Sequence, residues 1–201
     1  PQVWAWRKSN IPKLAAWCRK MMVIFPFEPE VYAGTKLDVE FVGHPLVDIV
    51  KSRPEESLKR DPSLVALLPG SRTHEVTRLL RPMLETARLL HKENSSLRFV
   101  ISAPREKIAK LCGGILEEFK QKYAAGTLPE INLVCSQTPR VLKEAGTGLA
   151  ASGTVTVECA IAGLPLVVIY RLNELTFKLA RLFIKLFRGF FTMVNIIANK
   201  T

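Results

Sequence analysis

Two short segments of the chain place small polar residues and charged side chains directly after apolar runs, a pattern suited to binding phosphate esters. In one of them, Ser152, Gly153 and Thr154 follow the apolar run 147–151, and Glu158 lies one turn into the helical pattern that comes next. Ser152 and Thr154 are favourable N-cap residues, and a glycine lets a ligand approach the backbone closely. The free N–H groups of a helix's first turn attract phosphate, so we expect phosphate at this turn and a ribose diol on Glu158.

The other segment, Pro69-Gly70-Ser71-Arg72, follows the apolar run 64–68 and precedes a helical pattern. It matches neither the P-loop nor the G-x-G-x-x-G fingerprint, so it supports neither a P-loop NTPase nor a dinucleotide enzyme. Because guanidinium groups pair bidentately with phosphate oxygens, Arg72 is the candidate phosphate ligand here, with Gly70 and Ser71 beside it.

Each candidate also has a purely structural interpretation. Residues Ser152 to Glu158 fit an ordinary capped helix with a solvated carboxylate, and Glu75 fits a capping acid as well as a ligand contact. His44, within a Gly-His-Pro tripeptide, is interpreted as a satisfied loop histidine rather than an active-site imidazole. The four cysteines have no C-x-x-C spacing and lie in or beside apolar segments, which favours buried, reduced thiols. Histidines and cysteines form no metal-ligand pattern, and we expect no metal and no cofactor.

Both segments belong to a regular alternation of strand and helix patterns that begins near residue 64. We expect strands at 64–68, 97–102, 131–135, 147–151 and 165–170. Helices are expected between them at 74–92, 104–123, 138–145 and 153–162, and after the last strand at 174–188. Five βα units with apolar strands predict an α/β fold in which helices flank both faces of a Rossmann-like parallel sheet. The carboxyl ends of parallel strands share one edge, so the two segments should meet there in a nucleotide-binding site.

The first 50 residues show shorter strand and helix patterns. We expect a strand at 2–6, a helix at 11–19, a strand at 21–25, a helix that opens at 26–32 and a strand at 39–42. Residues 51–63 contain two prolines and no apolar face, which is typical of a linker or domain edge. We therefore divide the chain into residues 1–50 and 51–201.

The net charge of the chain is +11, from 29 Lys and Arg against 18 Asp and Glu, which suits nucleic acid, an anionic membrane surface or a phosphorylated substrate equally. No apolar run reaches the roughly 18 residues needed to span a bilayer. The predicted helix 174–188 instead combines a basic stripe with a wide apolar face, as interfacial helices do. A mostly buried helix with a solvated basic edge is the alternative. The candidate membrane contacts on this helix are Phe177, Lys178, Arg181, Phe183, Lys185, Phe187 and Arg188.

Seven stretches, in order along nearly the whole chain, together resemble lipid-A-disaccharide synthases, which are glycosyltransferases of the GT-B fold. They are Pro1-Gln-Val-Trp-Ala-Trp-Arg7-Lys8, Pro26-Phe-Glu28, Phe41-Val-Gly43-His44-Pro45, Leu67-Leu-Pro-Gly-Ser-Arg72 with Glu75, Ala151-Ser-Gly-Thr154 with Glu158, Val167-Val-Ile-Tyr170-Arg171, and Asn195-Ile-Ile-Ala198. The resemblance implies two Rossmann-like domains: residues 1–50 would end the acceptor-side domain, and residues 51–201 would form most of the donor-binding one. It also implies that Ser71 and Arg72 hold the pyrophosphate, that Glu158 holds the ribose, and that Asn195 lies near the donor.

The activity implied by the resemblance is transfer of 2,3-diacylglucosamine from UDP to 2,3-diacylglucosamine 1-phosphate, which forms the lipid A disaccharide 1-phosphate and UDP. The implied partners are a UDP-sugar donor, an acylated glucosamine phosphate acceptor and the anionic cytoplasmic face of the inner membrane, with no nucleic acid. The chain starts at Pro1 without Met and stops soon after an apolar run, so we expect a fragment truncated at both ends. The general base is expected in the absent N-terminal region, so no catalytic residue is assigned in this chain.

Two other functions stay open at this point. A UDP-sugar epimerase-like GT-B enzyme would use the same ribose-binding carboxylate but would not need the basic, Phe-rich helix. A basic module that binds anionic lipid or nucleic acid would account for the charge but not for the two glycine-containing segments. Membrane association and nucleotide affinity distinguish these possibilities.

Overall fold

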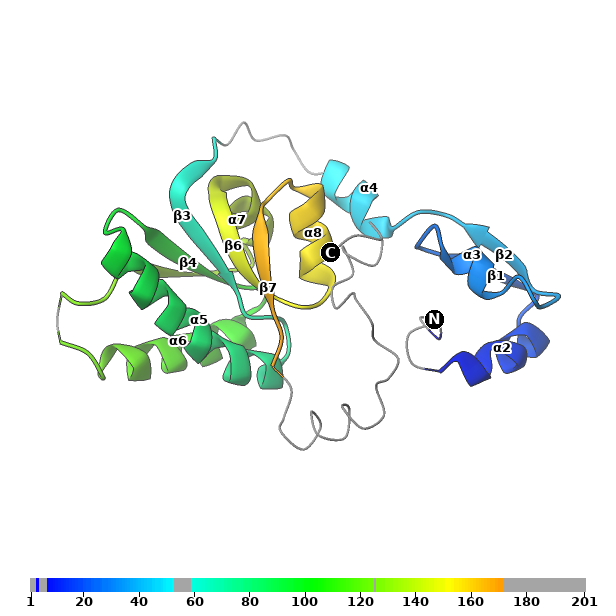
Figure 1. Cartoon of the computed structure of the whole chain (residues 1–201), viewed down its shortest axis with the longest axis horizontal. Coiled ribbons are helices and arrows are strands. Elements are labelled where there is room, and N and C mark those ends of the chain that lie inside the picture. Colours follow the sequence, from blue (N-terminus) through cyan, green and yellow to red (C-terminus); the bar gives the residue numbers. More distant parts are fainter. Residues whose placement is uncertain (1–2, 4–6, 53–58, 125, 172–201) are drawn as a thin grey trace. The chain divides into compact units, whose positions relative to one another are not determined.

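A computed structural model describes residues 3, 7–52, 59–124 and 126–171 of the chain (Figure 1). The chain forms two compact units, residues Pro1–Pro54 and Glu55–Thr201. In the part of the chain that the structure describes, no helix is both long and apolar enough to cross a bilayer. The predicted helix 174–188 lies outside the described residues.

The first unit contains two short parallel strands with helices beside them. Its elements are the 3-10 helix η1 (Lys8–Asn10), α2 (Ile11–Trp17), β1 (Lys20–Val23), α3 (Glu28–Val31), β2 (Asp38–Phe41) and α4 (Pro45–Lys51). Strands β1 and β2 pair from Lys20↔Asp38 to Val23↔Phe41. The small core of this unit is centred on Met21, Val23, Tyr32 and Leu37.

Two features of the first unit differ from the sequence-based expectation. Of the predicted strand 2–6 only Val3 is described, and it is helical, with its carbonyl accepting a hydrogen bond from the Arg7 N–H at 2.8 Å. Helix α4 was not predicted. It forms because Pro45 occupies its first turn, where proline's fixed φ is favourable, and because the side chain of His44 caps it.

The second unit is built on a five-stranded parallel sheet. Its strands are β3 (Asp61–Leu68), β4 (Arg98–Ala103), β5 (Ile131–Cys135), β6 (Ala145–Ala151) and β7 (Leu166–Ile169), in the order β5-β4-β3-β6-β7. The helices between them are α5 (Thr73–Glu93), α6 (Glu106–Lys120), α7 (Thr138–Glu144) and α8 (Thr154–Ile161). All five predicted strands and four predicted helices of this region are present, so the α/β fold with a parallel sheet is confirmed.

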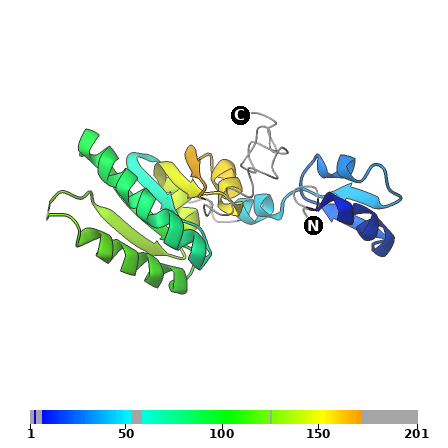
Figure 2. The ribbon, with the colours of Figure 1, turned by 60° about the horizontal axis from the view of Figure 1, so that its bottom comes forward.

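The sheet of the second unit is covered on both faces, as predicted. Helices α5 and α6 run side by side on one face, and α7 and α8 lie on the other (Figures 1 and 2). Alternation along β3 explains this arrangement, because successive side chains of a strand point to opposite faces. Val65 and Leu67 pack into the cluster with α5 and α6, whereas Ala66 and Leu68 pack into the cluster with α7 and α8.

Strand β3 begins at Asp61, inside the segment predicted as a linker. The Asp61 carboxylate fixes this polar start, because it accepts hydrogen bonds from the Ser63 N–H at 2.8 Å and the Ser63 hydroxyl at 2.6 Å. The pairing of β3 with β6 shifts register between Asp61 and Val65. At this irregularity Gly146 is required, since a Cβ there would lie 2.7 Å from the Asp61 carbonyl oxygen.

Candidate functional site

The carboxyl ends of β3 and β6 lie side by side, and the connections that follow these two strands cross opposite faces of the sheet. From β3 the chain passes over one face to β4, and from β6 it passes over the other face to β7. In open α/β sheets, ligands bind outside the strand ends at such a switch point. The pairing of Leu67 with Leu149 and Leu68 with Ala150 brings the two loops that follow, 69–72 and 152–153, to neighbouring strand ends. The structure thus places both predicted segments at one edge of the sheet.

The loop 69–72 is held by Glu75, in the first turn of α5. The Glu75 Oε2 atom accepts hydrogen bonds from the backbone N–H groups of Ser71 and Arg72, each at 3.3 Å. Glu75 is therefore the capping acid that the sequence allowed as one of two interpretations. Gly70 is required beside it, because its φ is +106° and a Cβ would lie 2.5 Å from Glu75 Oε2.

Arg72 presents its guanidinium at this edge. One of its nitrogens, Nη1, lies 2.7 Å from Glu75 Oε1, yet 70% of the Arg72 side chain stays exposed. Glu75 occupies the amides of Ser71 and Arg72, so these two N–H groups are not available to an anion. Side-chain donors at this loop include the exposed Ser71 hydroxyl and the remaining N–H groups of Arg72.

The turn before α8 differs from the prediction in its capping. The N-cap residue is Gly153, and no side chain of the described residues caps the helix, so the predicted N-cap role of Ser152 or Thr154 is wrong. The Thr156 hydroxyl donates a hydrogen bond to the carbonyl oxygen of the N-cap residue Gly153 at 2.7 Å. A Cβ at Gly153 would meet nothing within 4 Å, so the space over this glycine is open. The first turn of α8 therefore keeps N–H groups that no side-chain cap satisfies.

Glu158 lies one turn along α8 from Thr154 and is half-buried. Residues four apart share a face of a helix, so Thr154 and Glu158 lie on the same side of α8. The Glu158 charge also contributes, after burial, to raising the pKa of the neighbouring Cys159 thiol. Asn195, the remaining predicted nucleotide contact, lies outside the described residues, as do all the predicted membrane contacts.

Arg105 also lies at this edge, although it was not among the residues predicted from the sequence. It follows β4, and its Nη2 donates a hydrogen bond to the Ser71 carbonyl oxygen at 3.0 Å. The sequence held a signal for it, because Pro104 and Arg105 directly follow a buried strand, as Pro69 to Arg72 do. The strand order, which places β4 next to β3, was needed to bring the two loops together.

His44, in the first unit, has a structural role. Its Nδ1 accepts a hydrogen bond from the Leu46 N–H at 3.2 Å, and its ring centroid lies 5.7 Å from that of Phe25. The interpretation of His44 as a satisfied loop histidine is confirmed. Glu28 fixes the same region, because its buried carboxylate accepts the N–H groups of Ile24 and Phe25, both at 3.0 Å. Burial, followed by the charge of Glu28, raises the pKa of the nearby Tyr32 hydroxyl.

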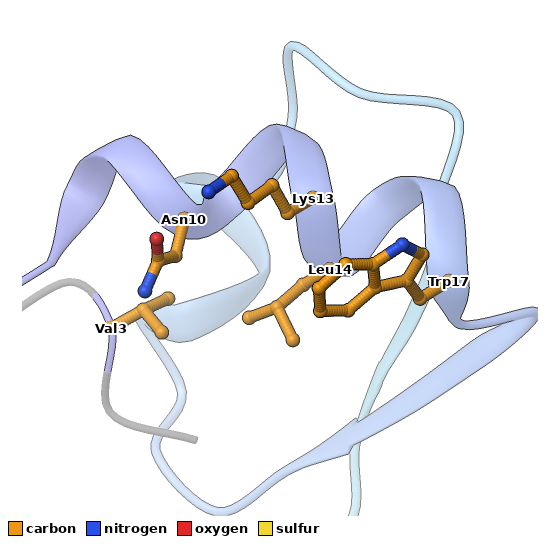
Figure 3. A pocket seen from close by; sticks show the side chains of 5 residues that line it. All are labelled: Val3, Asn10, Lys13, Leu14 and Trp17. Carbon is orange, nitrogen blue, oxygen red and sulfur yellow. The ribbon is translucent and has the colours of Figure 1, made fainter.

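The first unit also has a pocket of about 250 Å³ (Figure 3). It is lined by Val3, Asn10, Lys13, Leu14 and Trp17, and three of these residues come from α2. Val3, Leu14 and Trp17 make this lining mostly apolar, and Asn10 and Lys13 are its polar residues. Among the described residues, no group of His, Cys, Asp and Glu side chains is placed to hold a metal ion.

Comparisons of the sequence with a family model and with curated proteins give the same family. The family model described as lipid-A-disaccharide synthetase matches residues 1–201. The lipid-A-disaccharide synthase of Syntrophus aciditrophicus is 38% identical over 210 residues, which cover 100% of this chain and 52% of that protein. The synthase of Colwellia psychrerythraea is 34% identical and is covered over 51% of its length. The chain thus spans about half the length of the curated relatives it matches. A crystal structure of TarM shares 13% identity with a TM-score of 0.49, covering 81% of this chain and 32% of that one.

Proposed function

The chain belongs to the lipid-A-disaccharide synthetase family, and we propose that it is the donor-binding part of such a glycosyltransferase. The whole protein would transfer 2,3-diacylglucosamine from its UDP derivative to 2,3-diacylglucosamine 1-phosphate and release UDP. Residues 51–201 would bind the UDP-sugar in a GT-B arrangement, and residues 1–50 would end the acceptor-side domain. The general base would come from the part of the relatives that this chain does not span. The family match favours this function over an epimerase-like enzyme or a basic binding module.

The observation that carries the proposal is the meeting of loops 69–72 and 152–153 at the switch point of a parallel sheet. In this proposal Arg72 and Ser71 bind the pyrophosphate, and Gly153 and Thr154 give it access to the N-terminal end of α8. Glu158 accepts the two ribose hydroxyls from one turn further along the helix.

This arrangement suits departure of a nucleoside diphosphate. As the glycosidic bond breaks, negative charge grows on the oxygen that joins the sugar to the distal phosphate. Donors already aimed at that charge lower the barrier without reorganisation, and a guanidinium supplies charge-assisted hydrogen bonds. The backbone N–H of Arg72 donates a hydrogen bond to the Glu75 carboxylate, which holds loop 69–72 in place before the ligand binds.

Calorimetric titration of this chain with UDP tests the proposal. Loss of the Arg72 contact should cost about 1.5–3 kcal/mol, roughly one to two decades in affinity. Arg78→Ala is the matched control, because Arg78 is an exposed arginine further along the same helix, α5. Unchanged UDP affinity in a folded Arg72→Ala variant would contradict the assignment, and absence of UDP binding by the unaltered chain would contradict the function.

The ribose contact has its own test. Glu158→Gln should weaken UDP binding and shrink the preference for UDP over dUDP, since a carboxylate that accepts two hydroxyls discriminates against the deoxy ligand. An equal preference in both proteins would return Glu158 to a structural role on α8.

The proposal also includes an anionic membrane surface, at the cytoplasmic face of the inner membrane, as the place where the acylated acceptor is met. It rests on the sequence pattern of residues 174–191, where each basic residue near an anionic surface contributes on the order of 1 kcal/mol and salt weakens that share. The chain should sediment with anionic vesicles and poorly with neutral ones. Replacing Lys178, Arg181, Lys185 and Arg188 with Gln should remove this difference and leave UDP binding intact. A fourfold variant that still prefers anionic vesicles would place the contact elsewhere.

A further inference from the structure

Arg105 lies beside the candidate phosphate site, at the end of the strand next to β3. Its side chain is exposed, and its Nη2 donates to the Ser71 carbonyl oxygen at 3.0 Å. A guanidinium carries five N–H donors, so this single bond leaves most of them available. Among the described residues no ion pair neutralises Arg105, and the adjacent Glu106 pairs with Lys110 at 3.1 Å.

The backbone that carries Arg105 is anchored from two sides. Its carbonyl accepts the N–H groups of Ile108 and Ala109, both at 3.0 Å, and so begins helix α6. On the other side the Ser136 N–H donates to the Ala103 carbonyl at 2.8 Å, which ties the end of β4 to the loop after β5. Ser136 adopts a positive φ of 58° to do so, an uncommon conformation for serine. The guanidinium therefore projects from a fixed base.

The charges around loop 69–72 leave room for an anion. Glu75 contributes one negative charge and already accepts the amides of Ser71 and Arg72 together with the Arg72 guanidinium. Arg72 and Arg105 contribute two positive charges, so these three side chains together carry an excess of positive charge. Guanidinium groups pair bidentately with phosphate oxygens, so two of them can contact one doubly charged phosphate group.

The strand order indicates which part of a ligand Arg105 would meet. Along the edge the order is β6, β3, β4, which places Glu158 after β6, Arg72 after β3 and Arg105 after β4. Neighbouring strands lie about 5 Å apart, so Arg105 sits roughly two such steps from the ribose side of the site. A nucleotide whose ribose meets Glu158 would point its phosphates along this edge, with the distal phosphate nearest Arg105.

We propose that Arg105 binds the distal phosphate of a nucleoside diphosphate and sets the preference of this site for diphosphate over monophosphate. The inference rests on the proposed function, since it takes the ribose to lie on the β6 side. Arg105 acts together with Arg72, and its bond to Ser71 holds its guanidinium in place before the ligand binds.

Calorimetric titration of the whole chain with UDP and UMP tests the inference. Arg105→Gln removes the charge but keeps a polar side chain with N–H donors. It should weaken UDP binding about tenfold or more and leave UMP binding nearly unchanged. Arg105→Lys, which keeps the charge but not the planar fork, should fall between the two. Lys107→Ala is the control for loss of one exposed positive charge from the start of α6, and it should change neither affinity.

The possible outcomes distinguish failure of the Arg105 role from failure of the proposed UDP-binding function. A fall in UDP affinity with the UMP affinity retained supports a distal-phosphate contact. If a folded Arg105→Gln protein keeps the wild-type ratio of UDP to UMP affinity, the inference is wrong while the nucleotide site stands. If UDP and UMP weaken equally, Arg105 only positions loop 69–72, which also overturns the inference. If the unaltered chain binds no UDP, the inference and the proposed function fall together.

Discussion

Replacing Gly70 with alanine should destabilise the second unit and open the loop that holds Arg72. The added Cβ would lie 2.5 Å from Glu75 Oε2 and 3.1 Å from Glu75 Cβ. The Glu75 side chain must therefore swing away and give up its bonds to the amides of Ser71 and Arg72. In addition, an L side chain would have to adopt the φ of +106° that glycine accepts here.

The size of this effect follows from these two changes. Positive φ costs an L residue about 1–2 kcal/mol, and loss of a helix cap costs about 1 kcal/mol. The smaller conformational freedom of alanine in the unfolded chain returns about 0.5 kcal/mol. We therefore expect the free energy of unfolding to fall by about 2 kcal/mol.

Urea denaturation followed by far-UV circular dichroism measures this change. Gly114→Ala is the matched control, because Gly114 lies inside α6 and its added Cβ would meet nothing within 4 Å. That substitution should stabilise the protein by about 0.5–1 kcal/mol. In a Glu75→Ala background the cost of Gly70→Ala should drop to the backbone part alone. A Gly70→Ala protein as stable as the wild type, or a cost that Glu75→Ala does not reduce, would refute the reasoning.

Three further predictions concern the frame around the site. Arg60→Ala should lower the free energy of unfolding by about 2–3 kcal/mol in urea denaturation, because the Arg60 guanidinium donates hydrogen bonds to the carbonyls of Leu142, Ala145 and Ala162. A loss no larger than that of an ordinary surface substitution would show that these hydrogen bonds do not stabilise the fold. The pKa of Asp61 lies below its usual 3.8, first because of the hydrogen bonds from Ser63, so the Asp61 carboxylate stabilises the fold fully above that pH and less as the pH falls further. In acid titrations the free energy of unfolding should therefore depend less on pH below pH 4 in Asp61→Asn than in the wild type. An equally steep loss of stability in the variant would contradict this assignment. Burial raises the pKa of Cys112 to about 11 and that of Cys159 to about 12. At pH 8 a thiol reagent should therefore label the half-buried Cys18 and Cys135 first. Equal labelling rates of all four cysteines would contradict the burial of Cys112 and Cys159.

The sequence predicted the sheet of the second unit well because of how parallel strands are buried. A strand covered on both faces must be apolar throughout, so runs such as 131–135 stand out from the amphipathic helices between them. The polar start of β3 at Asp61 escaped prediction, since its fixation comes from side-chain bonds to Ser63 and Arg98 rather than from burial. Helix α4 escaped prediction because it is short and its cap is a histidine, which is an infrequent N-cap residue.

The candidate site was predicted as a location rather than as a set of contacts. Both loops were found from their glycines and hydroxyls, but the sequence offered several residues that could occupy the N-cap position of α8. In the structure Gly153 occupies it, and neither Ser152 nor Thr154 caps the helix. Arg105 could not be joined to the site from the sequence, because its contact with Ser71 depends on β4 lying beside β3.

Amide chemical shifts recorded during titration of the chain with UDP test the central claim most directly, because they report where the ligand binds. If UDP binds as proposed, the amides that shift should lie at one edge of the sheet, in loop 69–72, at residues 104–106 and at 152–158. The opposite edge, around Asp61 and Arg98, should not respond. Shifts confined to the first unit or to that opposite edge, or none at all at saturating UDP, would contradict it.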